Sequence, residues 1–266
     1  MPMSYPIVRF CLCLLLAASA AAMAAEKRVA LLIGNSRYSD APLKNPGTDV
    51  KLVGDALKQL QFDVSTVLDA DQKQIQRALR DFGTRASGAG VAFFYYSGHG
   101  VQSNGENYLV PLKAQIDKEA DIAIEGVAVN GLMRQIEEAR PGAAILVLDA
   151  CRDNPYAGKK GGNKGLGRID APTGTLVAYA TTPGSTATDD GIYARHLSRY
   201  LTETGLELKK VFDKTGLAVD QETKGKQRPR KDDGLYAELY LNGTHPPPPP
   251  PTQLANLNVP PSPQPP

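Results

Sequence analysis

Two reactive side chains each follow an apolar run in this sequence. VAFFYYS (91–97) leads through a glycine to His99, and AAILVLD (143–149) leads through an alanine to Cys151. A free thiol is mostly protonated at neutral pH, but a neighbouring imidazole can take its proton and activate it. The same imidazole can then protonate a leaving amine. The two residues therefore predict a nucleophile and its base, acting on an amide carbonyl.

Other roles for Cys151 are a packed thiol, half of a disulfide and a metal ligand. The only other cysteines, Cys11 and Cys13, lie in residues 1–24, which have the pattern of a secretory signal peptide. Its apolar stretch, 10–25, is shorter than the roughly 18 residues of a membrane span, and a retained anchor is the alternative. Cleavage would leave Cys151 alone, which excludes an intramolecular disulfide and a multi-cysteine zinc site. We therefore expect a secreted or periplasmic protein whose lone thiol is either buried or used chemically.

Attack on a carbonyl also requires hydrogen-bond donors for the developing oxyanion. The backbone N–H groups of Gly100 and Cys151 are the candidates, because a glycine lets backbone and substrate approach closely. One loop with His-Gly and the next with Cys would then supply base, nucleophile and oxyanion hole.

Alternating strand and helix patterns indicate how these residues are positioned. Apolar runs without polar alternation are typical of strands buried on both faces of a parallel sheet. We expect the α/β class, with a mostly parallel central sheet of about six strands and helices on both faces. The expected strands are 28–34, 63–68, 91–97, 143–149, 174–180 and an edge strand, parallel or antiparallel, at 235–241. The expected helices are 48–60, 72–86, 129–139, 196–203 and 206–219.

Functional groups in such sheets gather beyond the carboxyl ends of the strands. If strands 91–97 and 143–149 are neighbours, His99 and Cys151 lie at the same edge of the sheet.

Length and composition set the domain organisation. The chain has 266 residues and a formal net charge of +2, which gives no sign of a nucleic-acid partner. Residues 27–243 suffice for one substantial domain, and the proline-rich stretch 244–266 predicts an extended or disordered tail. The basic run 224–231 is expected to be a solvated loop. Four further side chains have expected structural roles, namely solvated positions for His196 and His245 and core packing for Tyr95 and Tyr96.

These motifs resemble those of the caspase-like cysteine peptidases (peptidase C14), especially the metacaspase and bacterial caspase-homologue branch. The specific part of the likeness is the pair YYSGHG (95–100) and LDACRDNP (148–155), in which His99 and Cys151 are separated by 52 positions. Weaker likenesses extend over nearly all of 27–243, in VALLIGNSRY (29–38), LKNPGTDVKLV (43–53), NYLVP (107–111), LVAYATTPGSTATDD (176–190) and TKGKQRP (223–229).

The resemblance implies a cysteine endopeptidase with the caspase-like fold, in which His99 is the base and Cys151 the nucleophile. It implies that Asp49 and Asp149 are the acids of the S1 pocket, with Ser97 beside them. Metacaspase-like enzymes cleave after Arg or Lys, whereas caspases proper hold a P1 aspartate with arginines and have Gln-Ala-Cys where this chain has Asp-Ala-Cys. The expected substrates are therefore proteins or peptides with a basic P1 side chain.

Each pocket acid also has a structural alternative. Asp149 could simply end a strand, and Asp49 could stabilise the start of a helix through the helix dipole. Three other functions stay open: a catalytically idle binding or scaffold domain, a peptidase with acidic P1 preference, and an acyl-transferring or ligating enzyme with the same dyad. The oligomeric state is open as well.

Calcium activates several metacaspases through clustered aspartates. Neither LKAQIDKEAD (112–121) nor VAVNGLM (127–133) matches such a cluster. We therefore expect no cofactor, and the scattered acids Asp117, Glu119 and Asp121 leave calcium activation as the alternative.

The loop 156–174 is rich in glycine and basic residues. It is either a flexible connection or, by resemblance, a processing loop in which the enzyme cuts its own chain. Lys159, Lys160, Lys164 and Arg168 would each suit a basic P1 preference.

Overall fold

The computed structural model describes residues 26–151, 166–182 and 189–243. The predicted signal peptide and the proline-rich tail, with His245, lie outside the described residues. Across the described ranges, no helix is both long and apolar enough to cross a membrane.

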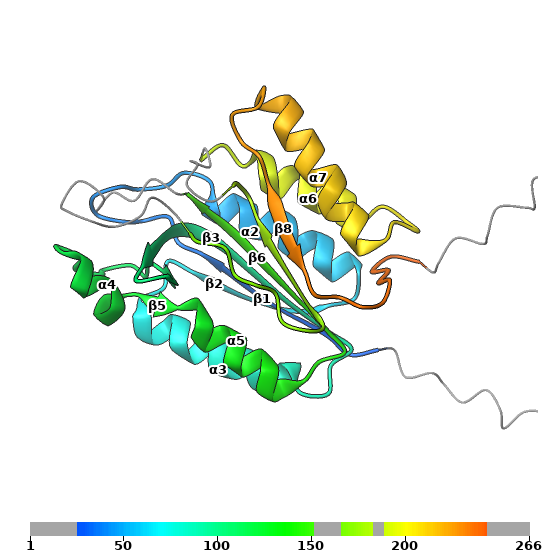
Figure 1. The fold of residues 1–266 in the computed structure, drawn as a ribbon, viewed down its shortest axis with the longest axis horizontal. Coiled ribbons are helices and arrows are strands. Elements are labelled where there is room, and N and C mark those ends of the chain that lie inside the picture. Colours follow the sequence, from blue (N-terminus) through cyan, green and yellow to red (C-terminus); the bar gives the residue numbers. More distant parts are fainter. Residues whose placement is uncertain (1–25, 152–165, 183–188, 244–266) are drawn as a thin grey trace, which may run out of the picture.

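An eight-stranded sheet forms the centre of the molecule (Figure 1). Its strands are β1 (Arg28–Gly34), β2 (Asp63–Leu68), β3 (Val91–Ser103), β4 (Glu106–Leu109), β5 (Val127–Ala128), β6 (Ala143–Cys151), β7 (Thr175–Tyr179) and β8 (Arg230–Asp233). Six of them lie in the order β2-β1-β3-β6-β7-β8, with neighbours parallel except for the antiparallel pair β7–β8. The far end of the long β3 forms an antiparallel ladder with β4, which in turn pairs with β5. The expected α/β fold with a mostly parallel sheet is confirmed.

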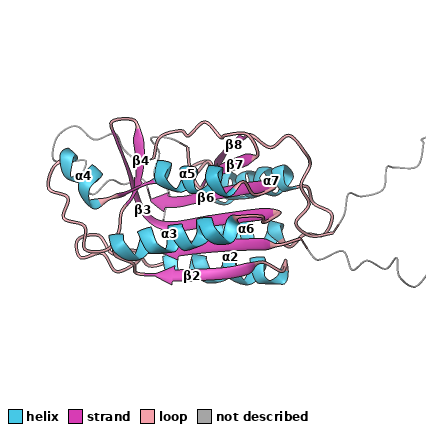
Figure 2. Ribbon diagram, turned by 90° about the horizontal axis from the view of Figure 1, so that it is seen from below, coloured by secondary structure: helices cyan, strands magenta, loops and turns pink. Residues whose placement is uncertain are grey.

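Helices cover both faces of this sheet (Figures 1 and 2). They are α2 (Pro46–Gln59), α3 (Gln72–Ala86), α4 (Glu119–Glu125), α5 (Val129–Ala139), α6 (Ile192–Leu201) and α7 (Leu208–Glu222). Helices α2, α6 and α7 bury their apolar side chains against one face, and α3 and α5 against the other. The short helix α4 lies beyond the main sheet, near β4 and β5.

The central strands are apolar on both faces because both are covered. Consecutive strand residues point to opposite faces. Tyr95 therefore packs in the cluster with α2, α6 and α7, and Tyr96 packs in the cluster with α3 and α5. Both tyrosines are fully buried, as predicted.

The two ends of the described fold lie together at the amino-terminal ends of the strands (Figure 1). Arg28 at the start of β1 donates from Nη1 to the carbonyl oxygen of Leu241 at 2.7 Å. The carboxyl ends of the parallel strands point toward the opposite end of the molecule.

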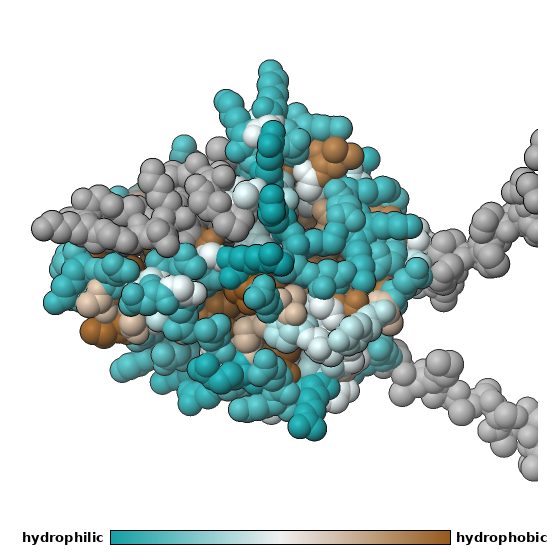
Figure 3. Space-filling model, in the orientation of Figure 1, coloured by the Kyte–Doolittle hydropathy of each residue, from teal (hydrophilic) through white to brown (hydrophobic). Residues whose placement is uncertain are grey.

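The surface is mainly hydrophilic on the face drawn in Figure 3. Exposed large hydrophobic side chains are distributed over separate elements rather than gathered on one. They are Leu52, Leu68, Ile124, Leu217 and Tyr236.

The predicted edge strand at 235–241 is wrong. The edge strand is β8, which includes the end of the basic run expected to be a solvated loop. Its charges are paired by neighbours, as Lys209 lies 2.9 Å from Asp233 and Arg168 lies 2.8 Å from Asp232. Such a polar strand lacks the apolar run that identifies the others.

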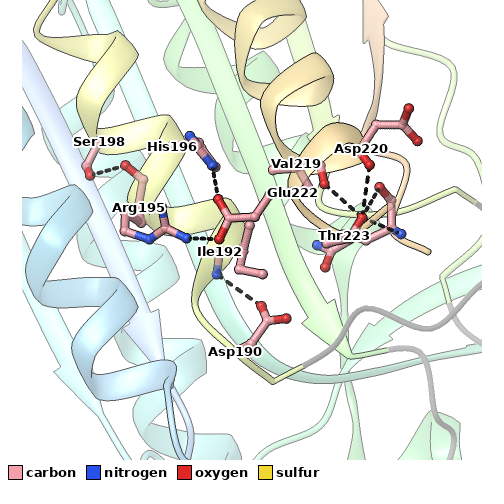
Figure 4. Close-up of polar contacts among 10 residues, drawn as sticks. Asp190, Ile192, Arg195, His196, Ser198, Val219, Asp220, Glu222 and Thr223 are labelled. Atoms are coloured by element: carbon pink, nitrogen blue, oxygen red, sulfur yellow. Dashed lines mark hydrogen bonds and ion pairs between the residues drawn. The ribbon is translucent and has the colours of Figure 1, made fainter. Parts of the chain in front are cut away.

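The prediction of a solvated His196 is also wrong. Helix α6 begins at Ile192, four residues earlier than expected, and His196 is only 9% exposed. Its Nε2 lies 2.7 Å from Oε2 of Glu222, at the end of α7, while Arg195 binds the other carboxylate oxygen (Figure 4). Packing of α6 against both α2 and α7 buries a face that the helix would otherwise expose.

The close approach of α2 to β1 can be tested by adding a methyl group at Gly34, the last residue of β1. A Cβ atom at Gly34 would lie 2.8 Å from the carbonyl oxygen of Pro46 and 2.9 Å from Cγ2 of Val50. Gly34→Ala is therefore expected to lower the free energy of unfolding by about 2 kcal/mol. Gly47→Ala, in the first turn of α2 with open space around it, is the control and should raise it by about 0.5 kcal/mol. Urea unfolding measures both, and equal effects would contradict the packing.

Candidate active site

The register between β3 and β6 brings the two predicted strand ends together. Ser97 is the partner of Asp149, and His99 is the partner of Cys151, in adjacent parallel strands. The backbones that carry the predicted base and nucleophile are thus neighbours at the carboxyl edge of the sheet. This adjacency follows from the shared amino-terminal start of the two strands, since Val91 is paired with Ala143.

The imidazole of His99 is buried and held by the loop after β1. Its Nε2 lies 2.7 Å from the carbonyl oxygen of Ala41, and the residue is 4% exposed. A carbonyl oxygen only accepts hydrogen bonds, so Nε2 carries the proton in this contact. In the neutral ring, Nδ1 is then the basic nitrogen. No sequence pattern predicts this contact of Ala41, because a main-chain carbonyl makes it and every residue type carries that group.

Asp49 and Ser97 form a buried pair between α2 and β3. The Ser97 hydroxyl donates to Oδ2 of Asp49 at 3.0 Å, and Oδ1 has no hydrogen-bond partner among the described residues. Burial raises the pKa of Asp49 from 3.8 to about 7, and the charges of Asp189 and Asp190 add to this while the Ser97 hydrogen bond opposes it. Asp49 thus lies in the first turn of α2, but its side chain points into a protein pocket.

Asp149 lies beside this pair. Its Oδ2 accepts a hydrogen bond from the hydroxyl of Tyr95 at 2.7 Å. Although part of the residue surface is exposed, burial of the carboxyl group raises its pKa well above the usual range, and the negative charge of Asp49 raises it further. The predicted acids Asp49 and Asp149 therefore interact electrostatically in one place.

Two further acids complete a narrow pocket around these residues. Asp189 accepts from the backbone N–H of Asn45 at 3.0 Å, and Asp190 accepts from that of Ile192 at 3.0 Å, where α6 begins (Figure 4). The lining residues are Leu43, Pro46, Asp49, Ser97, Asp149, Asp189, Asp190, Gly191, Ile192, Tyr193 and Gln227. This described lining contains four carboxyl groups and no basic side chain. The pair Asp189-Asp190 stands in a segment of family likeness, but only the fold places it beside Asp49.

The segment after α7 supplies the remaining polar wall. Gln227, 1% exposed, donates from Nε2 to the carbonyl oxygen of Ala180 at 3.0 Å. The hydroxyl of Thr223 accepts from the Gln227 backbone N–H at 3.0 Å. The basic run expected to be solvated therefore contributes a buried pocket residue.

Gly100, the predicted oxyanion donor, lies next to His99 in β3 and opposite Leu109 of β4. A Cβ atom there would lie 2.9 Å from Cδ2 of Leu166 and 3.1 Å from Cβ of Ala150. The position therefore has no room for a side chain, and the backbone at Gly100 lies close to Ala150 of β6.

The scattered acids considered for calcium have structural contacts. Oδ2 of Asp121 accepts from the backbone N–H groups of Asp117 and Lys118, at the start of α4. Glu119 accepts from the Ser103 hydroxyl at 3.2 Å. Within the described ranges, no group of three or more His, Cys, Asp or Glu side chains is arranged to hold a metal ion.

A mostly parallel sheet with helices on both faces, carrying a histidine and a cysteine on adjacent strand ends, defines the caspase-like α/β class. The family profile described as Caspase domain matches residues 27–240, and the chain belongs to this family of peptidase domains.

Individual proteins are more distantly similar in sequence to this chain. The chain is 29% identical over 195 residues to the human mucosa-associated lymphoid tissue lymphoma translocation protein 1 and to its mouse homologue. The match covers 70% of this chain but only 23% and 22% of those proteins, so the chain spans less than a quarter of their length. The crystal structure of the Drosophila initiator caspase Dronc has the same fold, with a TM-score of 0.60 and 17% identity over 82% of this chain and 85% of that one.

Buried Asp49 makes stability depend on pH. Because its pKa is raised, its contribution to stability is present below 3.8 and is lost as pH rises through about 7. Asp49→Asn removes this loss, so the stability of the variant relative to wild type should rise by about 2–4 kcal/mol between about pH 4 and pH 8. Urea unfolding across that range measures it. Asp55→Asn, an exposed acid on the same helix with a lowered pKa, should show no such rise, and parallel profiles for Asp49→Asn and wild type would refute the burial argument.

Proposed function

We propose that this protein is an exported cysteine endopeptidase that hydrolyses peptide bonds after Arg or Lys. The observation that carries the proposal is the acidic pocket at the strand ends where His99 and Cys151 are register partners. Membership of the caspase-domain family supports the reaction class.

In the proposed reaction, the Cys151 thiol gives its proton to Nδ1 of His99 and the thiolate attacks the scissile carbonyl carbon. The carbon–nitrogen bond breaks as His99 passes the proton to the leaving amine. Water then attacks the acyl-enzyme with His99 again as base, and the thiol is regenerated. The contact of Nε2 with the Ala41 carbonyl supports Nδ1 as the proton acceptor. We assign the oxyanion to the backbone N–H groups of Gly100 and Cys151.

The pocket supports a basic P1 residue. Burial raises the pKa of both Asp49 and Asp149, and the charge of Asp49 raises that of Asp149 further, so ionising both carboxyl groups is unfavourable while the pocket is empty. A guanidinium or ammonium group would stabilise both carboxylates, and a guanidinium can bind them through several N–H donors. A P1 aspartate would add another negative charge, which disfavours the acidic alternative.

The remaining features of the proposal come from sequence. The pattern of residues 1–24 supports a secreted or periplasmic location. We propose that the reaction needs no cofactor, since thiol, imidazole and backbone donors supply each step. Chelation with EDTA followed by calcium addition, with peptide turnover as the readout, tests this.

Turnover of Arg- and Lys-terminated fluorogenic peptides tests the dyad and the pocket. Cys151→Ala should reduce the rate to background, because the nucleophile is gone. Asp149→Asn should lower kcat/KM for basic P1 by roughly 100-fold, since a buried charge partner is lost. Asp55→Asn, which removes the same charge from an exposed site, is the matched control and should retain wild-type activity.

Three outcomes would overturn parts of this proposal. A folded wild-type protein without Cys151-dependent turnover would favour the idle scaffold. A preference for P1 aspartate would overturn the pocket assignment. Ligated products formed with an added amine nucleophile would favour acyl transfer.

Self-cleavage in 156–174 is a further expectation. Lys159, Lys160 and Lys164 lie outside the described residues, whereas Arg168 is 69% exposed at its side chain and pairs with Asp232. Wild type should be cut after one of these basic residues, and Cys151→Ala should stay intact. Mass spectrometry of the purified chains identifies the fragments. An intact wild type that still cleaves a basic peptide would contradict the expectation.

A further inference from the structure

A buried tyrosine outside the proposed dyad holds His99 by both its hydroxyl group and its ring. The Tyr38 hydroxyl accepts from the His99 backbone N–H at 3.1 Å and donates to the carbonyl oxygen of Val110 at 2.9 Å. The ring lies against the imidazole, with centroids 4.4 Å apart and planes tilted by 49°. Tyr38 therefore contacts the main chain and the side chain of the same histidine.

The surrounding contacts fix this arrangement. Tyr96 donates from its hydroxyl to the carbonyl oxygen of His99 at 2.7 Å, and the Val110 N–H donates to the same oxygen at 3.0 Å. A Cβ atom at Gly98 would lie 2.6 Å from the Tyr96 hydroxyl oxygen and 2.9 Å from that of Tyr38. A glycine is thus needed for the two hydroxyl groups to reach the backbone around His99.

The loop that carries Tyr38 is itself anchored. Asn35 is fully buried, and its backbone N–H donates to Ser97 O at 2.9 Å while its side chain binds the Ala70 backbone at both N–H and carbonyl. The same loop presents the Ala41 carbonyl to Nε2 of His99. One fixed loop therefore supports the imidazole at its face, through Tyr38, and at its edge, through Ala41.

We propose that Tyr38 is a positioning residue that fixes the ring orientation of His99, and thereby keeps Nε2–H on the Ala41 carbonyl, for proton exchange with Cys151. The inference rests on the proposed function of the dyad. Proton transfer requires the donor and acceptor to be aligned within hydrogen-bond reach, and small misplacements are costly to rate. The face of an aromatic ring also favours a cation beside it, as the imidazolium is after the thiol has been deprotonated.

Two variants separate the contributions of hydroxyl and ring. Tyr38→Phe removes the hydroxyl contacts, and Tyr38→Leu removes the ring as well. We expect kcat for an Arg-terminated peptide to fall roughly tenfold in the first and roughly 100-fold in the second. KM should stay within about twofold, because Tyr38 does not line the acidic pocket.

Tyr108→Phe is the matched control for these variants. Tyr108 is 8% exposed, as Tyr38 is, and it belongs to the same apolar cluster, but its hydroxyl donates to Glu106 at 2.9 Å. Tyr108→Phe should lose as much stability as Tyr38→Phe and keep the wild-type kcat. An equal fall in kcat for Tyr108→Phe would overturn the proposal. A change in the Tyr38 variants that affects KM alone would overturn it as well.

A second measurement is independent of turnover. The chain has three histidines, so His196→Gln and His245→Gln assign their nitrogen-15 signals in the full-length Cys151→Ala protein. In the protein that keeps Tyr38, and in the Tyr108→Phe variant, His99 should populate only the Nε2–H tautomer. In the Tyr38→Leu variant, both tautomers should be populated. An unchanged tautomer would refute the role of Tyr38. Absence of Cys151-dependent turnover would instead refute the proposed function, and the two failures are therefore distinguishable.

Discussion

The parallel register between β3 and β6 is the constraint on which the rest of the site depends. It pairs Ser97 with Asp149 and His99 with Cys151, so one alignment places two pocket residues and the predicted base and nucleophile at the same edge of the sheet. A slip of one residue would turn every side chain of a strand to the opposite face. Because both faces of β3 are buried under helices, such a slip would disrupt two apolar clusters. The core therefore specifies the site.

The pocket brings several acidic side chains together, which lowers the stability of the folded protein when no cation is bound. Asp49 and Asp149 are desolvated near each other, and Asp189 and Asp190 add negative charge. Buried charges without a cation cost free energy unless they are protonated or hydrogen-bonded. The hydroxyl groups of Ser97 and Tyr95 supply part of that compensation. Perturbed acids of this kind are typical of functional sites, where a ligand completes the electrostatics.

Much of this architecture could be predicted from sequence because it depends on local pattern. Continuous apolar runs identified the central strands, and α3 and α5 have the predicted bounds. Strand β8 was missed because its side chains are charged and ion-paired and form no apolar stripe, while its backbone pairs with β7. Tyr38 and the Ala41 carbonyl act on His99 through a loop closure that spans about 60 residues, so no local pattern reveals them. The roles of His99 and Cys151 remain predictions.

The joined ends of the described fold have a consequence for how such a domain is used. Arg28 fastens the start of β1 to Leu241, at the end of the sheet away from the acidic pocket. Additional segments attached at either end would emerge side by side and behind the site. Such a domain can therefore be joined to other segments at both ends without a change at the edge of the sheet that carries the acidic pocket. The much longer relatives, in which the matched region is less than a quarter of the chain, are consistent with such an arrangement.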